Sequence, residues 1–168
     1  MSDKAIVRIS ASLLPDSIKT TIGGTTIITL NEFSNDNKWA RSQTLVGTTS
    51  GDLIKSGSDF IAHYKLGEEA GGTSSATDEI QFLFVKHSGT SDGNVETTDV
   101  LCINIADGTP TGSATGDILI KPKECWFARM LDTDIDMINA ISLSSSLSGG
   151  TGNILAETIF IADDGGGN

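Results

Sequence analysis

Short apolar runs alternate with clusters of glycine, serine, threonine and proline along the whole chain. The runs are rich in β-branched residues and recur at intervals of about ten residues, which is typical of strands joined by turns. The predicted strands span residues 4–10, 25–33, 59–66, 80–87, 99–106, 117–121, 125–130 and 153–162. Residues 34–57 are polar and lack this pattern, so we expect an irregular excursion there.

Two of these runs are apolar on both alternating faces, which indicates central positions in a packed structure. They are "IQFLFVKH", residues 80–87, and "DVLCINIA", residues 99–106. About eight or nine strands with such turns are what a two-sheet sandwich or jelly roll requires. The sequence therefore predicts an all-β fold, an antiparallel two-sheet sandwich of jelly-roll type. We expect one domain over residues 1–162, with an N-terminal strand or arm, and a flexible glycine-rich tail over 163–168.

The stretch "GDILIKPKECWFARML", Gly116 to Leu131, resembles both a hairpin and a catalytic loop. Pro122 pre-sets its φ angle for a turn and cannot donate to a strand ladder, so it belongs to a connection. We interpret the stretch as a hairpin, with Ile118, Ile120, Trp126 and Phe127 buried or at an interface. Cys125, Phe127 and Arg129 then face one way, and Trp126, Ala128 and Met130 the other.

The segment "DIDMINAISL", residues 134–143, permits two interpretations. Ile135, Met137, Ile141 and Leu143 alternate as in a strand, whereas Ile138 and Ile141 fit one face of a short helix. We expect a turn followed by a strand.

Composition narrows the functions that the chain can perform. There are 22 Asp and Glu residues against 11 Lys and Arg, a formal net charge of −11. Such a charge repels polyphosphates, so nucleic acid and anionic membranes are poor partners. No secretory signal or long apolar segment is apparent, and we expect a soluble protein that is not exported. Cys102 and Cys125 lie in apolar runs, which favours two buried, reduced thiols over a disulfide or a reactive site.

Candidate catalytic and metal-binding residues are sparse. His63 and His87 lie in predicted strands without a second ligand at metal spacing, so we expect structural roles for both. In "DTDID", residues 132–136, the alternating carboxylates suggest calcium, but Met137 and Leu143 occupy the positions where a calcium loop needs glycine and glutamate. An acidic turn is the better interpretation, with an irregular calcium site as the alternative. Phosphate-binding and nucleophile-elbow motifs are absent. We therefore expect no enzyme activity, no cofactor and no metal.

Aromatic residues offer a different kind of site. Trp39, Tyr64 and Trp126 would stack on sugar rings if they were exposed. Trp126 lies in an apolar run, which favours a core position. A receptor- or glycan-binding module of a head or tail fibre is accordingly the alternative function.

The order "FLFVKHSGTSDG", "VLCINIADG", "ILIKPKECWFARM", "INAISLSSS" and "AETIFIA" resembles that of head decoration, or cement, proteins of tailed bacteriophages. The similarity covers residues 80–162. The family places glycine in the turn where this chain has Lys123, whereas Pro122 and Glu124 correspond. The resemblance implies a non-enzymatic jelly roll that decorates and stabilises a capsid in many copies.

The resemblance also implies partners and a location. The partner would be the major capsid protein, the location the virion surface after synthesis in the host cytoplasm, and the assembly a homotrimer. In an acidic chain, the few basic residues of the N-terminal half are candidates for docking on the shell. The candidate interface residues are Lys4, Arg8, Lys19, Lys38, Trp39 and Arg41.

Overall fold

The computed structural model of the protein describes residues 4–11, 22–29, 38–54, 62–63, 76–112, 117–131 and 133–163. It divides into two compact units, Met1–Asn35 and Asp36–Asn168. The first unit contains a two-stranded antiparallel ribbon, formed by β1 (Lys4–Ala11) and β2 (Ile22–Thr29). The flexible tail was predicted for residues 163–168, and residues 164–168 lie outside the described part of the chain.

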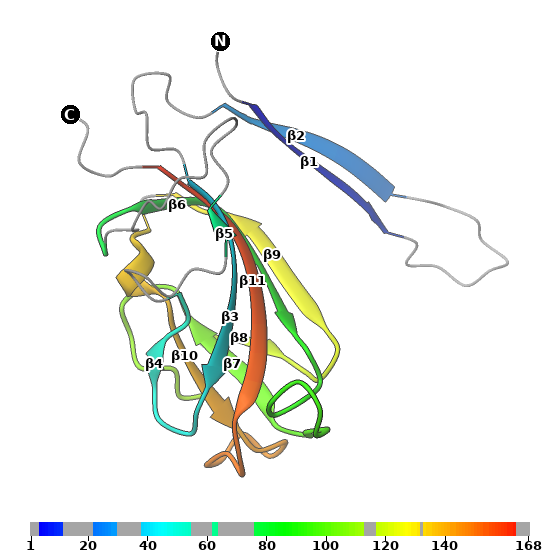
Figure 1. Ribbon diagram of the computed structural model, residues 1–168, viewed down its shortest axis with the longest axis vertical. Helices are drawn as coiled ribbons and strands as arrows, with labels where there is room; N and C mark the ends of the chain where they lie inside the picture. The colour runs from blue at the N-terminus through cyan, green and yellow to red at the C-terminus, as the bar shows by residue number, and fades with distance from the viewer. Residues whose placement is uncertain are drawn as a thin grey trace, which may run out of the picture. The chain divides into compact units, whose positions relative to one another are not determined.

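The second unit consists of two antiparallel sheets (Figure 1). One has the strand order β5-β3-β11-β6-β9, and the other the order β4-β10-β7-β8. The strands are β3 (Lys38–Val46), β4 (Gly51–Asp52), β5 (Ala62–His63), β6 (Glu79–His87), β7 (Val100–Asn104), β8 (Asp117–Ile120), β9 (Cys125–Arg129), β10 (Asn139–Leu143) and β11 (Ile154–Asp163). The predicted all-β, two-sheet sandwich is confirmed.

The strand order is that of an eight-stranded jelly roll, to which the two-residue strand β5 is added at the edge of β3. Among the eight strands β3, β4 and β6 to β11, only β7 and β8 are consecutive neighbours in one sheet. Every other connection between successive strands of this set crosses from one sheet to the other. The first and last of the eight, β3 and β11, lie side by side over nine residue pairs.

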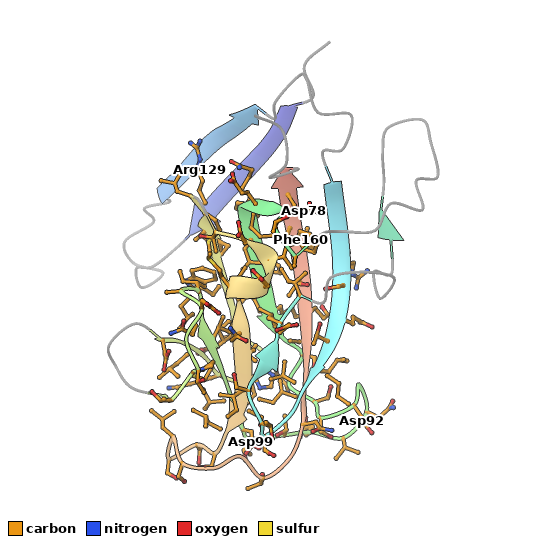
Figure 2. The ribbon with its side chains drawn as sticks, turned by 90° about the vertical axis from the view of Figure 1, so that its left-hand side faces the viewer. Asp78, Asp92, Asp99, Arg129 and Phe160 are labelled. Carbon is orange, nitrogen blue, oxygen red and sulfur yellow. The ribbon has the colours of Figure 1, made fainter. Side chains whose placement is uncertain are left out.

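The core lies between the two sheets and takes alternate residues from each strand. On β6, Leu83 and Val85 are fully buried, and Leu101 and Ile103 of β7 lie on the facing sheet. Phe160 of β11, marked in Figure 2, is the largest fully buried side chain of the described residues. Burying a side chain of this kind stabilises the fold by about 1.5–3 kcal/mol. The central positions predicted for residues 80–87 and 99–106 therefore agree with the structure.

The hairpin predicted for residues 116–131 is wrong. β8 pairs with β7 in the four-stranded sheet, whereas β9 pairs with β6 in the five-stranded sheet, so Lys121–Glu124 connects the two sheets. The backbone N–H of Lys123 donates to the His87 carbonyl at 3.2 Å, and that of His87 donates to the Glu124 carbonyl at 3.0 Å. The turn therefore continues the ladder with β6 and leads the chain away from β8.

The irregular excursion predicted for residues 34–57 is also wrong, because this region contains β3 and β4. The buried positions of β3 include Ser42 and Thr44. The hydroxyl groups of Ser42 and Thr158 lie 2.5 Å apart, and Thr44 donates to the Leu53 carbonyl at 2.7 Å. Because hydrogen bonds satisfy these polar groups, serine and threonine can occupy the buried positions of β3. The sequence of β3 therefore lacks the alternation of apolar and polar residues by which a strand is recognised.

Residues 134–143 form a turn followed by a strand, as predicted. A 3-10 turn spans Ile135–Met137, and β10 begins at Asn139. Ile135 and Ile138 are both fully buried. Ile141 lies in β10, so a helix that includes both Ile138 and Ile141 is excluded, and the helical part is the single 3-10 turn after Asp134.

Candidate functional site

Four connections of the jelly roll meet at one end of the sandwich (Figure 1). They are residues 47–50, 88–99, 121–124 and 144–153, called the loop end below. Hydrogen bonds to neighbouring strands hold two of these connections. The Ser142 N–H donates to the Gly47 carbonyl at 2.8 Å, and the Ser88 N–H donates to the Leu155 carbonyl at 3.1 Å.

Asp99 is the anchor of the loop end and is almost fully buried there (Figure 2). Its Oδ2 accepts hydrogen bonds from the backbone N–H groups of Thr151 and Gly152 at 2.7 and 3.0 Å, and from the Ser142 hydroxyl at 3.1 Å. The Thr151 hydroxyl donates to Oδ1 at 2.9 Å. Burial opposes ionisation, but these hydrogen bonds outweigh it, so the pKa of Asp99 lies below its usual value.

His87 joins Asp99 to the end of β6. Its Nδ1 accepts a hydrogen bond from the Gly89 N–H at 2.9 Å, so Nε2 carries the proton and donates to the Asp99 carbonyl at 2.9 Å. Burial lowers the pKa of His87, against an opposing effect of the Asp99 carbonyl and carboxylate. The neutral ring therefore acts as a structural link between two backbone segments.

A second carboxylate, Asp117, holds the connection between β7 and β8. It accepts from the Asn104 amide at 3.0 Å and from the backbone N–H groups of Thr111 and Gly112 at 2.8 and 2.9 Å. Burial raises the pKa of Asp117, but these hydrogen bonds lower it by more, so the pKa lies below its usual value. Nearby, burial raises the pKa of the Cys102 thiol to about 11. This cysteine is buried and free, as predicted.

The turn at Lys123 takes the conformation that a glycine would favour. Lys123 has a φ of 70°, and the Glu124 N–H donates to the Lys121 carbonyl at 3.0 Å. With Pro122 preceding the residue of positive φ, this is the arrangement of a type II turn. Lys123 thus adopts a left-handed backbone conformation, which is rare outside glycine.

The outward-facing side of the five-stranded sheet, called the outer face below, carries apolar side chains that the core does not use. Its members alternate with buried residues along each strand. They are Arg41, Gln43, Leu45, Glu79, Phe82, Phe84, Lys86, Cys125, Phe127, Arg129, Leu155, Glu157 and Ile159. Ile161 lies on the same side, opposite Phe82, but is buried. The outward face of a solvated antiparallel sheet is usually polar, so this composition is unusual.

One row of the outer face crosses three strands without a polar residue. Ile159 of β11 lies opposite Phe84 of β6, which in turn lies opposite Phe127 of β9. The exposed fractions are 46% for Ile159 and 40% for Phe127, while Phe84 is half-buried. Leu45, on β3, is 53% exposed. Contiguous exposed apolar side chains of this kind mark interaction surfaces.

The outer face carries both cations and acids. Arg41 ends the apolar row on β3, where it lies opposite Ile159, and Arg129 lies on β9. Lys86 forms an ion pair with Glu157, with 3.4 Å between Nζ and Oε2. Glu79 and Glu157 are the acids among the described members of the face, beside the three cations Arg41, Lys86 and Arg129.

The structure brings only part of the predicted interface together. Lys38, Trp39 and Arg41 lie on β3 of the five-stranded sheet, and Arg41 is exposed. Lys4 and Arg8 belong to β1 of the separate ribbon, and Lys19 lies outside the described residues. Sequence reasoning missed Phe84 and Ile159, because apolar residues within strands were assigned to the core, whereas Phe127 was expected to be buried or at an interface.

Other sequence predictions at this surface need correction or fall outside the described residues. Cys125 is exposed and free, so the burial predicted for it is wrong. Phe127, predicted to be buried or at an interface, is exposed and is not part of the core. Ile120 is buried, while Ile118 and Trp126 are half-buried and pack against the core. Trp126 therefore offers no open stacking surface. Tyr64 and Asp132 lie outside the described residues, as do the side chains of Trp39 and His63.

No protein-family model matches the chain, and no curated protein or solved structure matches it. Within the part of the chain that the structure describes, no three His, Cys, Asp or Glu side chains are grouped to hold a metal ion. The same part contains no helix with the length and apolar character needed to cross a membrane.

Proposed function

We propose that the chain is a non-enzymatic structural protein of a tailed-bacteriophage virion, which decorates the capsid and stabilises it. The observation that carries the proposal is the outer face, where Ile159, Phe84 and Phe127 form an exposed apolar row on a jelly-roll sheet. The resemblance of residues 80–162 to head decoration proteins agrees with this role.

The outer face suits a protein partner better than a small molecule. Its members are spread over β3, β11, β6 and β9 of one sheet, so they present a broad surface to a partner. Apolar and aromatic side chains at the centre with arginines beside them are the composition of protein interfaces. Arg41 and Arg129 would select a partner whose contact surface carries carboxylates. The major capsid protein is the partner that the proposal assigns.

Cementing follows from repetition of a modest contact. A protein that binds the assembled shell but not its separated subunits shifts the equilibrium toward the shell. Because the contact recurs across the lattice, no single copy needs high affinity. The loop end supports such a role, since Asp99 and His87 hold its connections in one arrangement.

The N-terminal ribbon is a second element suited to attachment. Strands β1 and β2 contain Lys4 and Arg8 but no carboxylate. Deletion of Met1–Ser12 should accordingly weaken attachment to capsids more than it weakens the sandwich.

The test measures attachment to virions from which the native copies have been stripped. Ile159→Lys should abolish most attachment, whereas Leu119→Lys, at a site 39% exposed on the other sheet, should retain it. Urea unfolding of both variants establishes that the sandwich is intact. Equal attachment by the two variants would reject the outer face as the docking surface. Failure of the unmodified chain to attach, together with binding to a glycan, would replace decoration by the receptor-binding alternative.

A further inference from the structure

β9 is an edge strand of the five-stranded sheet, and only β6 pairs with it among the described residues. The Met130 N–H donates to the Gln81 carbonyl at 3.1 Å, which fixes which residues of β9 bond to β6. In an antiparallel ladder the bonding residues alternate. Trp126 and Ala128 therefore bond inward, and the N–H and C=O groups of Cys125, Phe127 and Arg129 point away from β6.

The outward backbone groups and the outward side chains of β9 belong to the same residues. Cys125, Phe127 and Arg129 are exposed, while Trp126 and Ala128 are half-buried. The edge has little of the usual protection against pairing: Arg129 is the one charged residue within Cys125–Arg129, this strand contains no proline, and no bulge interrupts its pairing with β6. A second strand can therefore extend this sheet.

We propose that two copies of the chain pair edge to edge through β9, in antiparallel orientation about a two-fold axis at Phe127. Phe127 then lies opposite Phe127 of the second copy, and Cys125 lies opposite Arg129 of the second copy at both ends. These three positions are the ones whose N–H and C=O groups point outward. Each outward group thus meets a complementary group, as an isologous contact requires.

The side chains favour this occupant as well. Phe84 lies beside Phe127 in each copy, so pairing joins two apolar rows into one row across the two-fold axis. Aromatic residues in neighbouring cross-strand positions stabilise sheets. The charges are compatible, because each Arg129 faces a cysteine of the second copy and no like charges lie opposite each other.

The pairing uses β9 once in each copy, so assembly through this edge stops at two. It differs from the trimer that the resemblance implies. A five-residue edge buries little surface, so the dimer is weak and forms at high protein concentration. The inference does not depend on a capsid, because it concerns the isolated chain.

The first test is the mass of the full chain in solution over a concentration series, measured by sedimentation equilibrium. The expected result is a monomer–dimer equilibrium. Phe127→Lys places two ammonium groups opposite each other and should weaken the dimer about tenfold or more. Ile159→Lys changes the same face away from the edge and should leave the dimer intact. A monomer at every concentration, a trimer, or equal loss in both variants would overturn the proposal.

The second test fixes the register by cross-linking. Paired residues that exchange hydrogen bonds have Cα atoms about 5.5 Å apart, a separation that a disulfide can bridge. Arg129→Cys should therefore form a disulfide with Cys125 of the second copy under mild oxidation. The unmodified chain should not, because its two Cys125 residues lie at opposite ends of the pair. Rapid cross-linking of the unmodified chain, or none in the variant, would show that this register is wrong.

Discussion

Asp99 offers the sharpest test of how the loop end is held. Replacing it with alanine removes the acceptor of the Thr151 and Gly152 N–H groups and of the Ser142 hydroxyl. Ser142 is fully buried, so water cannot replace its bond, whereas Thr151 is exposed and regains part of the loss from solvent. A lost bond to a buried charged acceptor costs about 1.5–3 kcal/mol, and neighbouring losses are not additive. We expect Asp99→Ala to lower the free energy of unfolding by about 3 kcal/mol.

Asp99→Asn separates hydrogen bonding from charge. The amide oxygen can occupy the place of Oδ2 and keep the bonds from Thr151 and Gly152, while the amide NH2 group can donate to the Thr151 hydroxyl. Only the charge assistance is lost, so the expected decrease is about 1 kcal/mol. Asp92→Ala is the matched control, because Asp92 accepts two backbone N–H bonds in an exposed turn and should have the smaller effect.

The assay is urea unfolding at pH 7, repeated toward acid. Because the folded pKa of Asp99 is lowered, its contribution is fully present above the ordinary value of 3.8 and is lost as the pH falls through the folded value. The gap between the unmodified chain and Asp99→Asn should therefore close below about pH 4. A loss under about 0.5 kcal/mol for Asp99→Ala, or equal losses for both Asp99 variants, would refute the reasoning.

Three further predictions test other parts of the structure. The pKa of His87 is lowered from 6.5, so the unfolding free energy should fall as the pH drops below that value, and His87→Gln should flatten this dependence. Gly150→Ala would push its Cβ into a backbone carbonyl of β10 and should cost about 1–3 kcal/mol in urea unfolding, whereas Gly149→Ala, with open space around its Cβ, should cost far less. Iodoacetamide should label exposed Cys125 in the native protein. Cys102, whose pKa is raised to about 11, should stay unlabelled until the protein unfolds, and mass spectrometry identifies the labelled residue.

Strands that consist of continuous apolar runs were predictable from their sequences. Residues 80–87 and 99–106 carry continuous apolar runs, and β6 and β7 lie there. β3 was not predictable in this way, because it turns Ser42 and Thr44 inward and exposes Leu45. Its place in the sheet depends on partners far along the chain, such as Thr158 of β11. The local pattern of apolar and polar residues cannot predict such distant partners.

The connection at Pro122 shows a second limit of sequence reasoning. A tight turn there was predictable, because proline sets one of its φ angles. Whether the turn joins two strands of one sheet or passes between sheets is decided by the His87 backbone, which bonds to both Lys123 and Glu124. Most of the outer face was missed for a related reason, since Phe84 and Ile159 have the same sequence signature as core residues.

The proposed role is tested most directly by the abundance of this chain in purified virions of the genome that encodes it. Quantitative mass spectrometry gives the ratio of its copies to those of the major capsid protein, and image reconstruction places them on the particle. Decoration predicts a ratio near a simple fraction set by the symmetry of the shell, with density on the outer capsid surface. A few copies per particle confined to the tail or a fibre, or no copies at all, would contradict the account.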